Sequence, residues 1–261
     1  MIDDVVSAAL SVVIALVVAF PLAKPFKRHP WVFYGVAIAV VFIHLWYRFT
    51  GVYVASLQRF VDILTKGYLA AALFAVVMFT GTMDERSRLR RQLQPIRAEL
   101  SILSFVLALD HVIVFLPTYL PRLGSIFAHS PVIAMSLTVA LLLTVLYAVL
   151  SVTSVRVLRV RIPYRTWKAL QRSSYLMVGL LWLHIVLALG RSAFGGHGSL
   201  AAQVAFGSYT VVTVVYVMLR VRKAVYDRRA HDEVRSEAAA YVRANVTETP
   251  IPSVESQDRQ A

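Results

Sequence analysis

Four ionisable side chains stand inside long apolar stretches of the sequence: His44, Asp110, His111 and His184. An ionisable group in a lipid-embedded helix is costly, so each of these residues is a candidate for function. Imidazole binds metals and exchanges protons, whereas a carboxylate holds a polar neighbour or relays a proton. Other histidines lie in the connections between the apolar stretches, where we expect ordinary solvated side chains: His29, His129 and His197.

His111 and His184 are predicted to lie at a similar depth. His111 follows Arg97 by fourteen residues and His184 follows Arg172 by twelve, which the helical rise converts to about 21 Å and about 18 Å. Because the hydrocarbon core is about 30 Å thick, both histidines fall in the half of the core away from these arginines. Two helices with one histidine each at matched depth can hold a haem iron from both axial sides. The alternative is two unrelated histidines that form hydrogen bonds between helices.

Arg191 follows His184 by seven residues, so the two share a helix face and Arg191 lies about 10 Å further along. This position suits haem propionates that point to the outer surface; the alternative is that Arg191 only ends its helix. Near His184, Gly179 and Ala188 are small enough to leave room for a flat macrocycle. Small residues also serve plain helix packing, so this second signal leaves both interpretations open.

Asp110 and His44 have two interpretations each. Asp110 immediately precedes His111, so the two side chains point about 100° apart and cannot share a ligand face. We expect Asp110 to be the partner of a polar group on a neighbouring helix, with a proton relay as the alternative. His44 lies thirteen residues, or about 20 Å, beyond Trp31. It is either a quinone hydrogen-bond partner or a histidine satisfied by helix packing.

The composition defines the elements that must position these residues. Of the 261 residues, 58% are hydrophobic and 16% are charged, against about 45–50% and about 25% in soluble domains. These values exclude a soluble enzyme, a disordered chain and a nucleic-acid-binding domain, despite the net charge of +13. Cysteine is absent, which excludes disulfides, iron–sulfur clusters and thiolate metal sites. Any metal or cofactor must therefore be held by His, carboxylate, Tyr or Met side chains.

The chain is predicted to be all-α, a polytopic membrane helix bundle with about seven transmembrane helices. The expected spans are Val5–Phe20, Trp31–Tyr47, Gly67–Met83, Leu100–Leu116, Val132–Val155, Tyr175–Leu189 and Leu200–Leu219. Pro117 and Pro121 are expected to stop the fourth span, and Gly51–Asp62 to form a helix at the membrane surface. A charged helical extension, Arg220–Tyr241, should precede a disordered tail that starts near Ala244.

This organisation divides into three parts. Residues 1–66 would hold the N-terminal spans and the interfacial segment, residues 67–219 a haem-binding transmembrane domain, and residues 220–261 a cytoplasmic helical extension with its tail.

Lysine and arginine concentrate in alternate connections, and this pattern predicts the orientation. The basic side has Lys24, Lys27, Arg28, Arg86, Arg88, Arg90, Arg91, Arg97, Arg156, Arg159, Arg161, Arg165, Lys168, Arg172, Arg220, Arg222, Lys223, Arg228 and Arg229. The opposite side has only Arg48, Arg59, Lys66, Arg122 and Arg191. The positive-inside rule places the N-terminus outside and the C-terminus in the cytoplasm of a bacterial cell, with the chain in the cytoplasmic membrane. A docking surface for an anionic partner or lipid is the alternative use of the basic side.

Three stretches carry a resemblance to a known family: FTGTMDERSRLRRQL at 79–93, IRAELSILSFVLALDH at 96–111, and RTWKALQRSSYLMVGLLWLH at 165–184. They resemble the ferric reductase-like transmembrane family, and within it the haem-binding membrane subunit of the periplasmic methionine sulfoxide reductase system. In the third stretch the matching residues are Trp167, Lys168, Leu170, Arg172, Tyr175 and His184. The resemblance extends over residues 67–219.

The chain departs from the dihaem members of this family at two positions. Gln171 and Ala98 stand where those members have the inner pair of histidines. The resemblance therefore implies one haem b, near the outer face, with His111 and His184 as its axial ligands. A flavin (FMN) or a quinone near Gln171, Tyr175 and Trp167 could occupy the space of the missing inner haem.

These observations predict a b-type cytochrome subunit that needs partner proteins for its activity. The C-terminal part lacks a glycine-rich phosphate loop after a strand, so electrons are expected from a cytoplasmic flavin reductase or from membrane quinol. They would pass to an extracytoplasmic redox protein. Two other classes stay open: a small membrane transporter or channel, and a non-redox membrane assembly protein whose histidines only pack.

Overall fold

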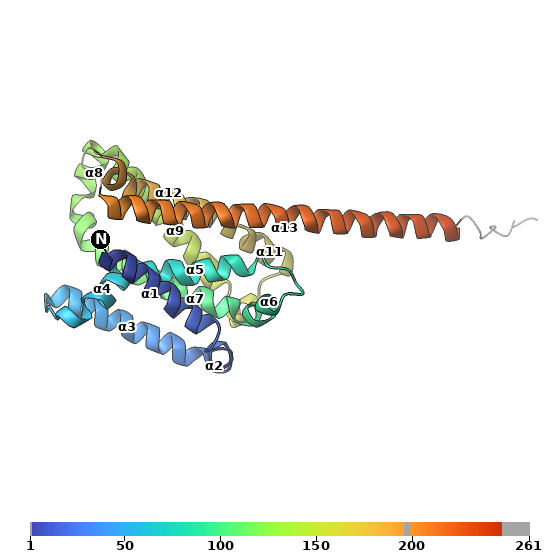
Figure 1. Cartoon of the computed structure of the whole chain (residues 1–261), viewed down its shortest axis with the longest axis horizontal. Helices are drawn as coiled ribbons and strands as arrows, with labels where there is room; N and C mark the ends of the chain where they lie inside the picture. The colour runs from blue at the N-terminus through green and yellow to red at the C-terminus, as the bar shows by residue number, and fades with distance from the viewer. Residues whose placement is uncertain (1, 196–198, 247–261) are drawn as a thin grey trace, which may run out of the picture. The chain divides into compact units, whose positions relative to one another are not determined.

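The computed structural model describes residues 2–195 and 199–246, and every regular element in these two ranges is a helix (Figure 1). His197 and the tail after residue 246 lie outside the described residues. The expectation of an all-α fold is therefore confirmed over the described part of the chain.

All seven apolar segments form helices. They are α1 (Ile2–Ala19), α3 (Pro30–Thr50), α5 (Tyr68–Thr80), α7 (Arg97–Tyr119), α9 (Pro131–Val152), α12 (Ser174–Phe194) and α13 (Leu200–Val246). Among the described residues, five helices are long and apolar enough to cross a membrane, or six when the bent pair α4–α5 counts as one span. The chain is thus a multi-pass membrane protein. A seventh span requires α1, whose described apolar part, Val5–Ala19, is shorter than each of the five spanning helices, so the number seven stays a prediction.

Short helices connect the long ones. They are α2 (Ala23–Arg28), η1 (Ala55–Leu57), α4 (Gln58–Thr65), α6 (Arg88–Leu93), η2 (Gln94–Ile96), η3 (Leu120–Arg122), α8 (Leu123–His129), α10 (Arg156–Arg159) and α11 (Tyr164–Arg172). The surface helix expected within Gly51–Asp62 corresponds to η1 and α4, although Val61, Ile63 and Leu64 of α4 are buried against the protein.

The expectation that Pro117 ends the fourth span is wrong. Helix α7 continues through Pro117 to Tyr119 before the short helix η3 begins. Proline is disruptive in a helix because it lacks an N–H donor and crowds the preceding turn. Here only two residues of α7 follow the proline, so the disruption falls in the last turn and the helix tolerates it.

Helix α5 lies at the centre of the unit Met1–Val217 and supplies residues to both of its cores. Leu73 belongs to a cluster that α1, α3 and α7 complete, whereas the adjacent Phe74 packs with Tyr147 of α9 and Met177 of α12. A helix that is apolar on all sides is buried on all sides. Figure 1 shows α1, α3, α5 and α7 running side by side.

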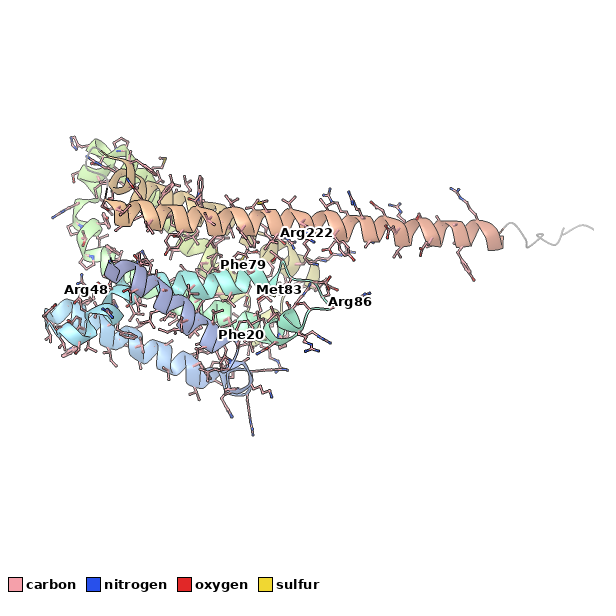
Figure 2. The ribbon with its side chains drawn as sticks, in the orientation of Figure 1. Phe20, Arg48, Phe79, Met83, Arg86 and Arg222 are labelled. Atoms are coloured by element: carbon pink, nitrogen blue, oxygen red, sulfur yellow. The ribbon has the colours of Figure 1, made fainter. Side chains whose placement is uncertain are left out.

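The basic connections of this unit meet at one end of the bundle. Figure 2 shows Phe20, Met83 and Arg86 at that end and Arg48 at the opposite end. The amide of Gln92 donates a hydrogen bond to the carbonyl of Phe20 (3.1 Å), which joins two of these connections. The alternation read from the sequence thus has a structural counterpart, while the direction of insertion stays a prediction.

The second unit starts at Met218 and is described as far as Val246. It is the C-terminal part of α13, which confirms the helical extension expected over Arg220–Tyr241. None of its residues from 218 to 243 is buried. Lys223 and Asp227, four residues apart, form an ion pair (3.1 Å) of the kind that supports a solvated helix.

Candidate functional site

His44 and Asp110 form a buried pair between α3 and α7. The exposed fraction is 2% for His44 and 0% for Asp110. Nδ1 of His44 lies 2.9 Å from Oδ1 and 2.8 Å from Oδ2 of the carboxylate. The expectation that Asp110 is the partner of a polar group on a neighbouring helix is confirmed.

The second ring nitrogen of His44 is also engaged. Nε2 lies 3.0 Å from the hydroxyl oxygen of Thr65, at the end of α4. With both nitrogens bound by protein groups and almost no exposure, His44 is a histidine satisfied by helix packing. The other interpretation, a hydrogen-bond partner for quinone, does not fit this geometry.

Thr65 also contacts His111. Nδ1 of His111 donates to the backbone carbonyl of Thr65 at 2.6 Å. The imidazole packs edge-on against Phe115, with ring centroids 5.1 Å apart, and against the backbone of Gly67 on another side. This arrangement leaves Nε2 as the nitrogen of His111 for a further ligand.

His184 is half-buried on α12. Its ring lies beside the backbone of Ser136 on α9 and close enough to His111 for an electrostatic interaction. Its Nδ1 atom is buried and has no hydrogen-bond partner among the described residues. His111 and His184 are thus within range of an electrostatic interaction, and each has one ring nitrogen for which the described residues show no hydrogen bond.

This donor set fits some metal groups and not others. Among the described residues no cluster of three or more His, Cys, Asp or Glu side chains could hold a bare metal ion. Structural and catalytic zinc sites use three or four such ligands. A haem iron needs only axial ligands from the protein, and two imidazoles provide both.

Arg191 is exposed in the last turn of α12. Its backbone carbonyl accepts a hydrogen bond from the N–H of Gly195 (2.9 Å), which closes the helix. The helix is continuous from His184 to Arg191, so the side chain lies about 10 Å further along than the histidine. A contact with a haem propionate remains a prediction.

A second candidate site is a cavity of about 140 Å³ between α5, α7, α9, α11 and α12, here called the Gln171 cavity. Both positions that lack the inner histidines, Ala98 and Gln171, line this cavity. Its other lining residues are Phe74, Val77, Met78, Gln94, Arg97, Ser101, Tyr147, Leu150, Ser154, Arg159, Trp167, Ser174 and Met177. Tyr175, which we expected near this site, is 44% exposed and does not line it.

The polar groups around Gln171 are loosely arranged. The amide nitrogen of Gln171 lies 3.5 Å from the hydroxyl oxygens of both Thr153 and Ser154, the outer limit for a hydrogen bond. Trp167 is fixed more firmly, because its indole N–H donates to the carbonyl of Thr153 (3.2 Å) and the Arg159 guanidinium lies 4.4 Å from its ring. The amide of Gln171 is thus the group most readily offered to a ligand.

Aromatic rings connect the Gln171 cavity with the region of the histidines. Tyr147 lines the cavity, and its ring centroid is 5.3 Å from Phe105 and 5.4 Å from Phe74. Phe105 precedes His111 by six residues on α7, or about 9 Å. The Tyr147 hydroxyl donates to Ser104 (2.5 Å), which in turn donates to the carbonyl of Ala70 (2.7 Å).

Sequence reasoning missed Thr65 and Tyr147. A hydroxyl in an apolar span, such as that of Tyr147, needs a partner and was a usable signal. The pairing of His44 with Asp110 also had a signal. Asp110 lies thirteen residues beyond Arg97, or about 20 Å, which equals the expected depth of His44.

The helices, their composition and this interior define a multi-pass membrane protein with candidate redox sites. Residues 66–182 match the family model described as "Ferric reductase like transmembrane component", which supports a ferric reductase-like domain in this part of the chain. The matched region contains His111, Ala98 and Gln171 and ends two residues before His184.

One curated relative is 33% identical over 240 residues, and its printed description is "Uncharacterized protein", from Treponema pallidum (strain Nichols). The alignment covers 90% of this chain and 65% of the relative, so the chain spans less than two thirds of that protein's length. No solved structure matches the chain.

Proposed function

We propose that this chain is a b-type cytochrome subunit of a membrane electron-transfer system, with one haem b held by His111 and His184. The observation that supports it best is that the imidazoles of His111 on α7 and His184 on α12 lie within range of an electrostatic interaction. Nδ1 of His111 is bound by Thr65, and Nδ1 of His184 is buried without a partner among the described residues. A haem bound here would supply one-electron transfer.

The protein contributes binding and orientation to this site. His111 and His184 would hold the haem iron with their imidazoles, and Thr65 would fix the ring of His111. Both imidazoles are half-buried, so the site is partly shielded from water.

Haem content tests this assignment. His111→Ala and His184→Ala should each remove haem from the full-length protein, measured as pyridine haemochrome per protein and by reduced-minus-oxidised spectra. His129→Ala is the matched control, because His129 is an exposed histidine that contacts only the Ser125 carbonyl of its own helix (3.2 Å) among the described residues. Near-stoichiometric haem with unaltered spectra in both test variants would contradict the proposal.

The proposal includes a single haem. Ala98 and Gln171 line the same cavity of about 140 Å³, far below the 300–1,000 Å³ of pockets for drug-sized ligands. Neither side chain supplies a nitrogen ligand that can replace a histidine. A haem-to-protein ratio close to two would overturn this part of the proposal.

The Gln171 cavity is the proposed donor site, and each of the two donor classes has an observation in its favour. A cavity of about 150 Å³ is known to hold benzene, so a one-ring quinol headgroup fits the space as it stands. A flavin needs a larger opening, but Arg97 and Arg159 on the lining suit its phosphate. FMN that copurifies with the protein would favour the flavin; reduction by a quinol analogue alone would favour the quinol.

The orientation and the partners complete the proposal. The basic end of the bundle, which carries the Gln171 cavity, faces the cytoplasm, and the N-terminus lies outside. Electrons enter from a cytoplasmic flavin reductase or from quinol in the bacterial cytoplasmic membrane and leave to an extracytoplasmic redox protein. A methionine sulfoxide reductase is the acceptor that the resemblance suggests, and reduction of such a purified partner by the reduced cytochrome would test it.

A further inference from the structure

We infer that His44, Asp110 and Thr65 act as positioning residues that hold His111 in one tautomer, with Nε2 free for a ligand. The inference rests on the proposed function for the identity of that ligand, a haem iron. It adds three residues to the site, and His44 and Thr65 both lie outside the region 66–182 that matches the family model.

The contacts form a closed path through the protein. The Asp110 carboxylate binds Nδ1 of His44 (2.9 Å), Nε2 of His44 meets the Thr65 hydroxyl (3.0 Å), and the Thr65 carbonyl meets Nδ1 of His111 (2.6 Å). His111 follows Asp110 in the chain, so the path returns to its start. These four residues are here called the histidine network.

The donor and acceptor types assign the proton positions. An ionised carboxylate only accepts, so Nδ1 of His44 donates and Nε2 of neutral His44 accepts from the Thr65 hydroxyl. A backbone carbonyl also only accepts, so Nδ1 of His111 must carry the proton. The lone pair of His111 is therefore on Nε2, and metal-binding histidines are commonly held in this way by a carbonyl on the other nitrogen.

The break between α4 and α5 makes the Thr65 carbonyl available. Helix α4 ends at Thr65 and α5 begins at Tyr68, with a bend of 45° between the two. Carbonyls in the last turn of a helix have no partner within that helix. In an unbroken helix this oxygen would accept a hydrogen bond from an N–H of the same helix. Because of the bend it is free to accept one from Nδ1 of His111.

Gly67 leaves the space that the imidazole needs. Its φ is +68°, a conformation that L residues with side chains rarely adopt. A Cβ atom at this position would lie 3.4 Å from Cγ and Nδ1 of His111. The ring is thus held by the Thr65 carbonyl, by the Gly67 backbone and by Phe115.

The first test reads the tautomer and needs no haem. Full-length protein with ¹⁵N-labelled histidine, before haem loading, should show His111 protonated on Nδ1. Thr65→Val and His44→Leu keep the carbonyl of residue 65 but remove the bond between the Thr65 hydroxyl and His44 that holds this carbonyl in position. The carbonyl can then move away from Nδ1, and the signal should become a mixture of tautomers, whereas Thr65→Ser should keep the single form. His184→Ala, which leaves the network intact, should also keep it. This reading distinguishes the inference from the proposed function, because it stands or fails without a bound iron.

The second test measures haem affinity and the midpoint potential. Loss of a residue that orients a metal ligand costs about 10- to 100-fold in metal affinity, so Thr65→Val should weaken haem binding by about tenfold and shift the potential. Thr65→Ser should restore both. The matched control is Thr80→Val, since Thr80 is a buried threonine on α5 whose hydroxyl bonds, among the described residues, only to the Val76 carbonyl (2.7 Å) of its own helix.

Two results would overturn the inference. One is a His111 that stays protonated on Nδ1 alone in both Thr65→Val and His44→Leu. The other is haem affinity for Thr65→Val within twofold of the unmodified protein while the Thr80→Val control behaves normally. Should His44→Leu fail to fold, Thr65→Val and Thr65→Ser decide the question by themselves.

Discussion

The histidine network and the Gln171 cavity lie along the same helix, α7, yet they treat polar groups in opposite ways. In the network, His44 and Asp110 are buried and directly paired at 2.8–2.9 Å. Around the cavity, the amide of Gln171 reaches its hydroxyl neighbours only at 3.5 Å and an open space remains. A fully satisfied polar network is rigid, which suits a permanently bound cofactor, whereas loose contacts suit a ligand that enters and leaves.

The difference has its origin in where helices are broken. At the network, the chain breaks between α4 and α5 and uses the freed Thr65 carbonyl at once. At the cavity, α11 and α12 join at Ser173, and the side chain of Ser174 satisfies the Gln171 carbonyl (2.7 Å) within the same turn. The first break therefore builds a contact between helices, and the second contributes only local ones.

Removal of one partner from each region should give the largest contrast. Asp110→Ala leaves the Nδ1–H group of His44 buried without its acceptor, and an unsatisfied buried donor costs about 1–3 kcal/mol. Gln171→Ala removes only marginal hydrogen bonds and should change the free energy of unfolding by less than about 0.5 kcal/mol. Thermal or denaturant unfolding in detergent measures both. Equal losses in the two variants would mean that the network is no more rigid than the cavity.

A methyl group added at Gly67, in the break between α4 and α5, should lower the free energy of unfolding by less than Asp110→Ala does. Gly67→Ala forces a side chain into the left-handed region and against His111, at a cost of about 1–2 kcal/mol. Gly35→Ala is the matched control, because Gly35 lies in the middle of α3 with no atom within 4 Å of the added Cβ, and alanine is the better helix former. The comparison is again of unfolding free energies; a Gly67→Ala protein as stable as Gly35→Ala would show that the break is not constrained.

The helices, and the need of Asp110 for a polar partner, could be predicted from the sequence. The contacts of the histidine network could not. A run of about twenty apolar residues has no way to satisfy its backbone in lipid except as a helix, so the long spans were predictable. Asp110 was predicted to have a polar partner for the same energetic reason. Its identity was not, because only packing decides which helix faces α7.

Thr65 shows why the rest could not be predicted. Its hydroxyl and carbonyl become important only after the chain bends by 45° behind it, and that bend falls at Gly67, which has a positive φ and lies beside the ring of His111. Pro117 teaches a similar lesson, since a proline stops a helix only where the lost hydrogen bond and the crowded turn are costly. The resemblance named Ala98 and Gln171 as vacant positions, and the structure adds that they line one cavity.

A kinetic test separates the two regions by function. Gln171→Leu should leave haem content and spectra unchanged but slow haem reduction by a quinol analogue or a flavin reductase by about fivefold, since one hydrogen bond to the donor contributes about 1 kcal/mol. Gln58→Leu, on α4 away from the cavity, serves as the control. An unchanged rate in Gln171→Leu would place the donor elsewhere on the protein.

The smallest effect is expected at Arg191, which belongs to neither region. Its side chain is exposed at the end of α12, so its charge is screened by water and its influence on a neighbouring site is modest. A cation stabilises the reduced, more negative form of a haem with propionates nearby. Arg191→Leu should therefore lower the midpoint potential, on the order of tens of mV, without loss of haem.

Arg86→Leu, at the opposite end of the bundle from Arg48 (Figure 2), is the control for a general change of charge. Redox titration at low and high salt checks both, because the shift for Arg191→Leu should shrink as salt rises. A potential that does not move at low salt would leave Arg191 with the single role of ending its helix.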